Sequence, residues 1–354
     1  MVSFVIVGSG YRSEYYGRIA ADYPEVFRAI FLCRSEEKAR LVTAHTGIPA
    51  TTDPGKAVAI DPDFVVVAVD REHVADVAEE WAGKGFPVVT ETPVGVSMEK
   101  LERIMELGRN GARIVCCEQY HRHPILENGF AAVREGLLGK PQTGYLSMVH
   151  DYHAASILRR MLLADGESYV LRGERKESPV TDTDSRYGAF YDGRVGKEVR
   201  DIIHISYESG KTAIYDFAST QYRSYIRSRH LTLRCEKGEW NDRLQYYIDE
   251  KGNPRRIMLM PDIPEKYRVL DKQSLRDSRR AWQNELVLDT IWDEYAIATI
   301  LLDMKEYAEG GKSPYPLKEA IDDAVFWLMI QEAVKNPWQE KSVPKNIMAH
   351  IKNS

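Results

Sequence analysis

Residues 4–13 read FVIVGSGYRS, a short apolar run of β-type residues that ends in a glycine turn. Gly8 permits a tight turn, and Gly10 lets the backbone approach a phosphate group, because a Cβ atom there would occupy the ligand's space. A helix start after this turn would offer free N–H groups and the positive end of its dipole to an anion. Ser13, at the third position of G-x-G-x-x-G, is small enough for close helix–strand packing. The stretch therefore predicts a dinucleotide-binding turn, with an ordinary structural turn as the alternative.

Strand and helix patterns alternate after this turn. Apolar runs that predict strands occupy residues 28–33, 63–70, 87–90 and 113–118. Amphipathic or charged segments that predict helices occupy residues 13–22, 71–84 and those following Ser35 and Ser97, and Ser97 is the expected N-cap of its helix. This alternation predicts an α/β fold with a doubly wound parallel sheet covered on both faces; the family resemblance described below implies that this is an N-terminal Rossmann domain over residues 1–123.

The pattern changes after His123-Pro124. We expect helices over 126–133 and 153–162, a strand over 145–149, and antiparallel strands over 202–207, 212–217, 230–235, 244–248 and 256–259. Two long helices are expected over 286–307 and 317–334, and the polar stretch 166–197 is predicted to be a mobile loop or lid. Residues 124–354 are thus predicted to form an α+β domain with a mostly antiparallel sheet; the family resemblance described below implies that this sheet is open and that the domain serves substrate binding and oligomerisation.

Composition is that of an ordinary globular protein of 354 residues, with 44% apolar and 29% charged residues. Lys and Arg total 48 and Asp and Glu total 53, which gives a formal charge of −5. This balance argues against nucleic acid or an anionic membrane surface as a partner. No apolar run approaches the roughly 18 residues that a spanning helix needs.

The four cysteines include no C-x-x-C pair, and adjacent Cys116 and Cys117 lie in an apolar run that predicts buried thiols. The N-terminal residues enter a strand directly, without the pattern of a secretion signal. Both observations favour a reducing cytoplasm as the compartment.

The end of the second predicted strand bears on cofactor choice. A carboxylate at this place binds the 2′-hydroxyl of NAD, whereas a nearby Arg accommodates the 2′-phosphate of NADP. Here Cys33 stands about where the carboxylate would be, and Arg34 and Ser35 follow. We expect NADP to bind at least as well as NAD; a solvated Arg34 in a loop is the alternative.

The sequence resembles the glucose–fructose oxidoreductase/inositol dehydrogenase (Gfo/Idh/MocA) family. The likeness is carried by Gly8-Ser9-Gly10, residues 62–69 with His73, Ala82-Gly83-Lys84, Glu91-Thr92-Pro93, residues 136–139 and Gly238-Glu239. It implies a Rossmann domain, an open sheet that forms a homo-oligomer (dimer or tetramer), and hydride exchange between NADP or NAD and a secondary hydroxyl of a sugar or polyol. With the glycine turn, it implies cofactor contacts from Gly8, Ser9, Gly10, Tyr11, Arg12, Arg34, Ser35, Val69, His73, Glu91 and Gln119.

One departure from the family concerns proton transfer. The resemblance implies Glu-Lys-Pro where this chain has Glu91-Thr92-Pro93, and the lysine usually carries the proton of the reacting hydroxyl. Thr92 cannot titrate near neutral pH, so it can only position a hydroxyl by hydrogen bonding. Another residue must be the base, or the usual reaction is absent.

Histidines are the candidates for that base. His153 corresponds to the histidine of a family motif, and at a predicted helix start the dipole favours its neutral form. We expect His153 to be the proton acceptor, His121 to contact the nicotinamide side of the pocket, and His150 and Tyr152 to contact substrate. N-capping or packing is the alternative for His153. A zinc site built from two histidine pairs, 121/123 and 150/153, is the less favoured alternative to a protein without a metal.

A basic cluster spans residues 222–230. In an extended chain its arginines would share one face, where Arg227 could clamp an anionic group of the substrate. A solvated loop or an oligomer contact is the alternative.

Three functions remain open at this stage. The leading one is an NAD(P)-dependent oxidoreductase acting on a sugar-like, possibly anionic small molecule. The second is a redox-neutral enzyme that cleaves glycosides through transient oxidation by a bound nicotinamide. The third is a non-catalytic nucleotide-binding sensor or partner subunit.

Overall fold

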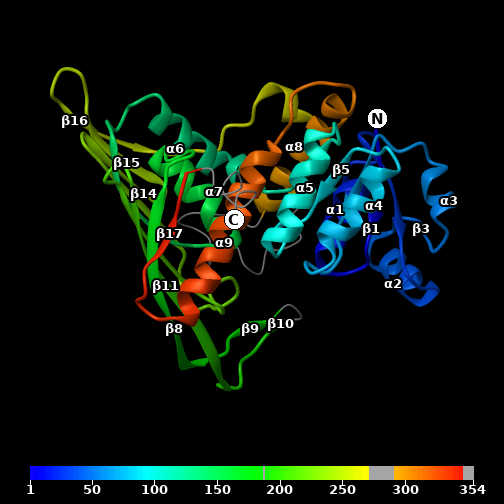
Figure 1. The fold of residues 1–354 in the computed structure, drawn as a ribbon, viewed down its shortest axis with the longest axis horizontal. Helices are drawn as coiled ribbons and strands as arrows, with labels where there is room; N and C mark the ends of the chain where they lie inside the picture. The colour runs from blue at the N-terminus through cyan, green and yellow to red at the C-terminus, as the bar shows by residue number, and fades with distance from the viewer. Residues whose placement is uncertain (186–187, 271–290, 346–354) are drawn as a thin grey trace. The chain divides into compact units, whose positions relative to one another are not determined.

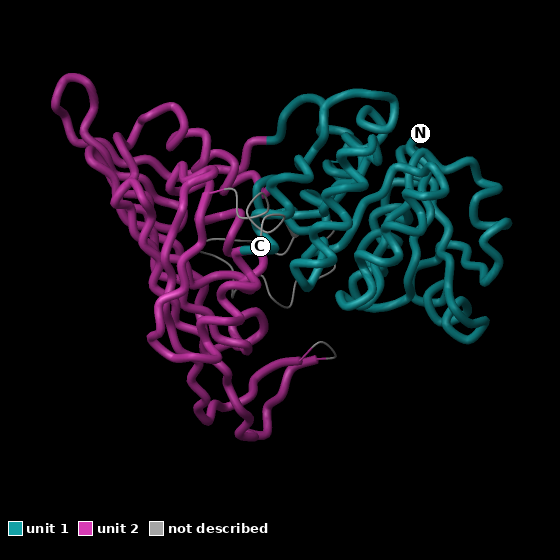
Figure 2. Tube along the Cα trace, in the orientation of Figure 1, with its two compact units in different colours: residues 1–122, 263–276, 291–325 teal, residues 123–262, 277–290, 326–354 magenta. Residues whose placement is uncertain are grey.

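The computed structural model describes residues 1–185, 188–270 and 291–345. The chain forms two compact units, shown in different colours in Figure 2. Unit 1 holds residues 1–122, 263–276 and 291–325, and unit 2 holds residues 123–262, 277–290 and 326–354. Each unit has its own sheet and its own core.

Unit 1 is built on a six-stranded parallel sheet with the order β3-β2-β1-β4-β5-β6 (Figure 1). Its strands are β1 (Val2–Val7), β2 (Phe27–Leu32), β3 (Ala50–Thr51), β4 (Phe64–Val67), β5 (Val88–Thr90) and β6 (Ile114–Cys116). Central strands are buried on both faces, which explains why they read as continuous apolar runs. The order reverses between β1 and β4, and such a point is where ligands bind in doubly wound sheets.

The helices of unit 1 alternate with these strands, as predicted. They are α1 (Tyr11–Asp22), α2 (Glu36–Thr46), α3 (Pro54–Val58), α4 (Val74–Gly83), α5 (Met98–Arg109) and the 3₁₀ turn η1 (Tyr120–Arg122). Ser97 caps α5 by accepting from the backbone N–H of Lys100 (3.2 Å), so that prediction is confirmed. Ser35 caps α2 in the same way through Lys38.

Two later segments also belong to unit 1, namely the 3₁₀ turn η2 (Glu265–Leu270) and helix α8 (Ile291–Ala308). Asp303 of α8 accepts from Arg122 (3.0 Å) and from the hydroxyl of Tyr267 in η2 (2.7 Å). Glu294 pairs with Arg18 of α1 at 2.8 Å. The predicted boundary after residue 123 lies beside the end of the first segment of unit 1. Residues 263–276 and 291–325 also belong to unit 1, whereas the prediction assigned all of residues 124–354 to one domain.

Unit 2 contains a nine-stranded sheet with the order β16-β15-β14-β13-β7-β12-β11-β8-β17. The strands are β7 (Pro141–Ser147), β8 (Tyr169–Thr181), β11 (Val195–Tyr207), β12 (Thr212–Ala218), β13 (His230–Cys235), β14 (Gly238–Asn241), β15 (Leu244–Ile248), β16 (Pro254–Met258) and β17 (Lys341–Val343). Among the described strands of this sheet, only β7 and β12 pair in parallel. The predicted fold class, a Rossmann unit plus an open and mostly antiparallel sheet, is confirmed.

The prediction of a loop or lid over residues 166–197 is wrong. Most of this stretch forms β8 and the start of β11, which pair antiparallel from Tyr169↔Tyr207 to Thr181↔Val195. Short strands β9 (Asp184–Ser185) and β10 (Gly188–Ala189) lie between them. The residues are polar because many of them are exposed, and cross-strand ion pairs such as Arg175–Asp201 (2.7 Å) link the two strands. Polarity therefore did not distinguish a solvated strand pair from a loop.

Helices α6 (Pro124–Arg134) and α7 (Asp151–Leu162) belong to unit 2, and α9 (Leu317–Lys335) passes into it at Phe326. A Cβ atom at Gly129 of α6 would lie 2.1 Å from the ring of Trp240, which is fully buried. Helix α6 therefore rests directly on β14. Of the helix predicted over 286–307, residues 286–290 lie outside the described residues, and α8 accounts for the rest.

Candidate functional site

The glycine turn lies where the order of the unit 1 sheet reverses. Gly8 follows β1 with φ +129°, and a Cβ atom there would lie 2.3 Å from the carbonyl oxygen of Ala68, the residue after β4. No L side chain fits this approach or adopts this φ readily. Gly8 therefore allows the ends of β1 and β4 to meet.

Gly10 has a different role. It is the N-cap residue of α1, and no side chain caps the helix there. A Cβ atom at Gly10 would have nothing within 4 Å, so the space in front of the helix start is open. Free N–H groups of a helix start beside such a space suit a phosphate group.

Close packing of α1 on the sheet depends on Gly17 rather than on Ser13. A Cβ atom at Gly17 would lie 2.6 Å from the ring of Phe31 on β2. Ser13 is fully buried, but its hydroxyl donates to the carbonyl of Gly10 (2.6 Å) and so stabilises the turn. The sequence signal for Gly17 was a glycine one turn further along the same helix.

Glu91, a predicted cofactor contact, holds α1 in place. Its carboxylate accepts from the Tyr16 hydroxyl (2.6 Å) and from Nε of Arg12 (3.2 Å). Burial raises the pKa of Tyr16 well above its ordinary value, and nearby Cys117 and Glu91 raise it further, so Tyr16 stays a donor. Nη2 of Arg12 is buried and has no hydrogen-bond partner among the described residues, which leaves a cationic donor for an anion.

The carboxyl end of β6 leads to Gln119 and His121. Gln119 is 1% exposed, and its Oε1 has no hydrogen-bond partner within the described ranges. Buried amides are normally paired, so this oxygen fits a ligand amide. His121 lies in η1, where its Nε2 accepts from Nε of Arg122 (3.0 Å) and its ring lies 5.0 Å from that of Tyr315. Cys116 and Cys117 are buried thiols, as predicted.

The other predicted cofactor contacts also lie at this edge of the sheet. Arg34 is exposed just after β2, and Ser35 is the α2 cap already described. Val69 follows β4, and exposed His73 is the N-cap residue of α4. Contact of these residues with a cofactor stays a prediction. Thr92, predicted to position the reacting hydroxyl, is half-buried in the bend after β5, and that role is likewise untested.

Tyr11 and Ser9 complete the turn. The Tyr11 hydroxyl lies 3.0 Å from that of Tyr15, one helical turn further along α1. Ser9 is half-buried between the two glycines. Their predicted contacts with a cofactor are likewise untested.

The predicted substrate residues of unit 2 gather at the start of α7. His150 is the N-cap residue, and its N–H donates to the hydroxyl of Tyr222 (3.0 Å). The His150 ring lies 4.6 Å from that of Tyr222 and 5.0 Å from that of Phe217. Tyr152 and His153 have ring centroids 4.5 Å apart, and His153 is 6% exposed. His153 therefore lies in the first helical turn, as its proposed role requires.

Asp151 was missed by the sequence reasoning. It is the first residue of α7, and its carboxylate accepts from the backbone N–H of Tyr152 (3.0 Å) and from the amide of Gln331. Burial, together with the nearby charge of Asp201, raises the pKa of Asp151 to about 6. A carboxylate two residues before the predicted helix start was the available signal.

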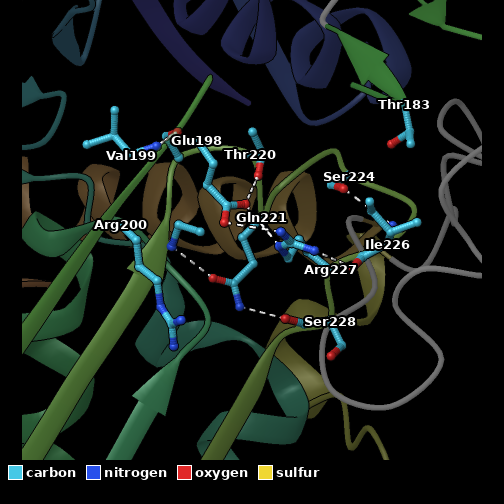
Figure 3. A network of polar contacts seen from close by, with 12 residues as sticks. Thr183, Glu198, Val199, Arg200, Thr220, Gln221, Ser224, Ile226, Arg227 and Ser228 are labelled. Atoms are coloured by element: carbon cyan, nitrogen blue, oxygen red, sulfur yellow. Dashed lines mark hydrogen bonds and ion pairs between the residues drawn. The ribbon is translucent and has the colours of Figure 1, made fainter. Parts of the chain in front are cut away.

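The segment 219–229, which we call the Tyr222 loop, consists of turns and irregular chain, so the extended conformation on which a shared arginine face would depend is absent from it. Within it, Arg229 is 8% exposed, and Arg227 pairs with Glu198 at 2.9 and 3.2 Å. Figure 3 shows Thr220 and Arg227 both directed at that carboxylate. Contact of Arg227 with a substrate anion stays a prediction.

Gln221 holds the inner side of the Tyr222 loop. Its side-chain amide donates to the carbonyls of Ser147 (2.8 Å) and Ser228 (2.5 Å), and its Oε1 accepts from the N–H of Ala218 (3.1 Å). Through these bonds the loop is fixed to the ends of β7 and β12. Tyr222 is therefore held beside the start of α7 by side chains far apart in the sequence.

Two features, a metal-binding cluster and a membrane-spanning helix, are absent from the described residues. Within them, no three or more His, Cys, Asp or Glu side chains are grouped so as to hold a metal ion. No helix in the same residues is both long enough and apolar enough to cross a membrane.

A parallel sheet of this order, with a glycine turn after its first strand, defines a dinucleotide-binding Rossmann unit joined to an open-sheet unit. Residues 2–118 match the Gfo/Idh/MocA family model, described as an oxidoreductase family with an NAD-binding Rossmann fold. The resemblance to this NAD-binding family is thus confirmed over that region. A comparison with curated proteins finds no match.

Solved structures share the whole fold at low identity. An oxidoreductase from Agrobacterium radiobacter, solved with NAD+, L-tartaric acid and magnesium, is 14% identical with a TM-score of 0.70, covering 99% of both chains. A levoglucosan dehydrogenase, solved with NADH and levoglucosan, is 14% identical with a TM-score of 0.70, covering 97% of this chain and 99% of that one. A biliverdin reductase from Synechocystis, solved with biliverdin and NADP+, is 13% identical with a TM-score of 0.63, covering 94% and 99%. At such identities the likeness shows the fold.

Proposed function

We propose that this protein is an NAD(P)-dependent oxidoreductase that transfers hydride to or from a secondary hydroxyl of a sugar, polyol or related small molecule. The observation that carries the proposal is the start of α1, where Gly10 faces open space, no side chain caps the helix, and Nη2 of Arg12 lacks a partner among the described residues. These groups offer N–H donors and positive charge to a pyrophosphate.

Residues of unit 1 would hold the cofactor. The first-turn N–H groups of α1 and Arg12 would bind the pyrophosphate, and Gln119 would offer its unpaired oxygen to an amide. Arg34 follows β2, where its guanidinium would bind the 2′-phosphate of NADP and so favour NADP. When bound, the nicotinamide ring would supply the hydride acceptor or donor.

Residues of unit 2 would handle the proton. We assign His153 as the acceptor of the hydroxyl proton, since it is an imidazole in the first turn of α7, next to the predicted substrate contacts His150 and Tyr152. Thr92 of unit 1, which replaces the family's lysine, would only position a hydroxyl. His150 and Tyr152 would contact the substrate beside Tyr222.

The first test is cofactor binding by full-length protein stripped of nucleotide. Wild type should quench its tryptophan fluorescence saturably with NADH and NADPH. Gly10→Ala should weaken both by about 10-fold or more, because the new methyl group would occupy phosphate space. Its melting temperature should stay unchanged, because that methyl group meets no protein atom within 4 Å. Failure of wild type to bind any form of either cofactor would overturn the proposal.

Turnover then tests the chemistry. Levoglucosan, L-tartrate and myo-inositol serve as first probes, with NAD(P)H formation followed at 340 nm. His153→Asn should lower kcat about 100-fold or more while leaving NADH binding intact. Glycoside cleavage without net NADH formation would instead favour the redox-neutral alternative. Cofactor binding with no turnover of any alcohol or glycoside would favour a non-catalytic sensor.

A further inference from the structure

Unit 2 contains a polar trio that the proposed oxidoreductase function does not use. The hydroxyl oxygen of Ser228 lies 2.6 Å from Nε2 of His230, and Nδ1 of His230 lies 3.2 Å from Oδ2 of Asp242. Ser228 is the second residue before His230, and Asp242 lies in the turn between β14 and β15. The three side chains are thus ordered as nucleophile, base and orienting carboxylate.

Asp242 is rigidly placed, which gives the trio a defined geometry. Its Oδ1 accepts from the N–H of Leu231 (2.9 Å), and its own carbonyl accepts from Nε1 of fully buried Trp240 (2.7 Å). Asp242 has φ +53°, a left-handed conformation that Asp tolerates better than most residues. The carboxylate is therefore anchored to the sheet through both side chain and main chain.

The position of Asp242 determines which ring nitrogen of His230 carries the hydrogen. An ionised carboxylate can only accept a hydrogen bond, so Nδ1 of His230 carries the hydrogen and donates the hydrogen bond to Asp242. In the neutral ring Nε2 is then an acceptor, and the Ser228 hydroxyl donates to it. A serine whose proton is already directed at a base is a better nucleophile than an ordinary surface serine.

The trio is also accessible. Ser228 is exposed, and the His230 side chain is 42% exposed. The backbone carbonyl of Ser228 accepts from the side-chain amide of Gln221 (2.5 Å), so the Ser228 backbone is held in place although the residue is exposed (Figure 3). His230 and Leu231 point to opposite faces of β13, and Leu231 is the buried one.

We propose that Ser228, His230 and Asp242 form a second reactive centre, in which Ser228 accepts acyl groups from activated esters of small carboxylic acids. Oγ of Ser228 bonds to the ester carbonyl carbon, and the bond from that carbon to the leaving alkoxide breaks. The Ser228 proton passes to Nε2 of His230 and on to the alkoxide. Water then attacks the acyl carbon and gives a proton to His230. The carboxylic acid leaves, and the proton returns to Ser228.

The test uses full-length protein, a fluorophosphonate probe with peptide mapping, and p-nitrophenyl acetate for turnover. Ser209 is the internal control. It is an exposed serine of the same unit, and its side chain is hydrogen-bonded to the carboxylate of Glu167 rather than to a histidine. We expect the probe to label Ser228 at least about 100-fold faster than Ser209, the range that a positioned general base supplies. Equal labelling of the two serines in wild type would overturn the proposal without any variant.

Variants assign the roles within the trio. Ser228→Ala should abolish the label and most ester turnover, and Ser209→Ala should leave both unchanged. His230→Gln should slow labelling about 100-fold, and Asp242→Asn about 10-fold, at unchanged melting temperature. Labelling of Ser228 at the wild-type rate in a folded His230→Gln protein would also overturn the proposal. Loss of cofactor binding would leave these outcomes unaffected, because the centre is independent of the oxidoreductase function.

Discussion

The glycine turn of unit 1 and the surroundings of His150 in unit 2 are built in opposite ways. The turn consists of consecutive residues in which missing side chains, at Gly8 and Gly10, create the geometry. The surroundings of His150 come from α7, β12 and the Tyr222 loop, and large aromatic side chains create them. The first region is therefore specified by the local backbone, and the second by packing between distant segments.

The strongest way to break the first region is Gly8→Ala. We expect a loss of about 3 kcal/mol or more in the free energy of unfolding, because the methyl group meets the Ala68 carbonyl and φ is +129°. Urea unfolding measures the change. The matched control is Gly10→Ala, which meets nothing within 4 Å and should unfold like wild type. Similar stability of both variants would contradict a special role of the Gly8 backbone.

Unit 2 should respond to a comparable change in its packing. Gly129→Ala would press a methyl group onto Trp240, and we expect about 2 kcal/mol of destabilisation. Denaturation followed by Trp fluorescence reports it. The control is Gly83→Ala, at the end of α4 with no atom within 4 Å, which should be neutral or slightly stabilising. A neutral Gly129→Ala would mean that α6 can move away from β14 at no cost.

Asp151 provides a test by pH. Its pKa is raised to about 6 in the folded protein, so the folded state favours the protonated carboxyl over the carboxylate. Stability should fall as the pH rises from about 4, where unfolded Asp ionises, to 6, and Asp151→Asn should remove this loss. We expect the variant to gain about 2 kcal/mol at pH 8 and much less at pH 4.5, measured by urea unfolding. An equal gain at both pH values would show that charge is not the cause.

Glu198→Gln should loosen the Tyr222 loop by a smaller amount. Burial raises the pKa of Glu198, but hydrogen bonds from Arg227 and Thr220 outweigh it and lower the pKa below its ordinary value. The pair therefore stabilises the fold above the ordinary Glu pKa and is lost as pH falls through the lowered one. We expect about 1 kcal/mol of destabilisation at pH 7, since Arg227 is partly exposed. Glu177→Gln, in an exposed pair with Lys197, should be neutral; equal effects would argue against a special loop contact.

The last prediction concerns cofactor choice rather than stability. Arg34→Ala should weaken NADPH binding about 10-fold and leave NADH binding unchanged, because only NADP carries the 2′-phosphate. Fluorescence titration measures both. Arg40→Ala, an exposed arginine of α2, is the control and should change neither. Equal weakening of both cofactors by Arg34→Ala would contradict a phosphate contact.

Sequence reasoning succeeded where local rules decide structure. Most of the alternating strands and helices of unit 1, the Ser97 cap and strands β11, β12, β13, β15 and β16 of unit 2 were predicted, whereas β3, α3, β14 and β17 were not. It failed at β8 and the first half of β11, where exposed polar residues pair across two strands. It also did not reveal the ion-pair partner of Arg227, because Glu198 is 29 residues away in the chain and becomes its neighbour only in the folded sheet.

By itself, the sequence determined the kind of fold and the place of the glycine turn, since hydrophobic periodicity and glycines act over a few residues. Only the tertiary structure decided that Gly17 rather than Ser13 meets the sheet, and that Glu91 holds Arg12 and Tyr16. It alone brought His230 between Ser228 and Asp242. Hydrogen bonds and close packing depend on which distant residues become neighbours, and sheet register, not spacing along the chain, establishes that.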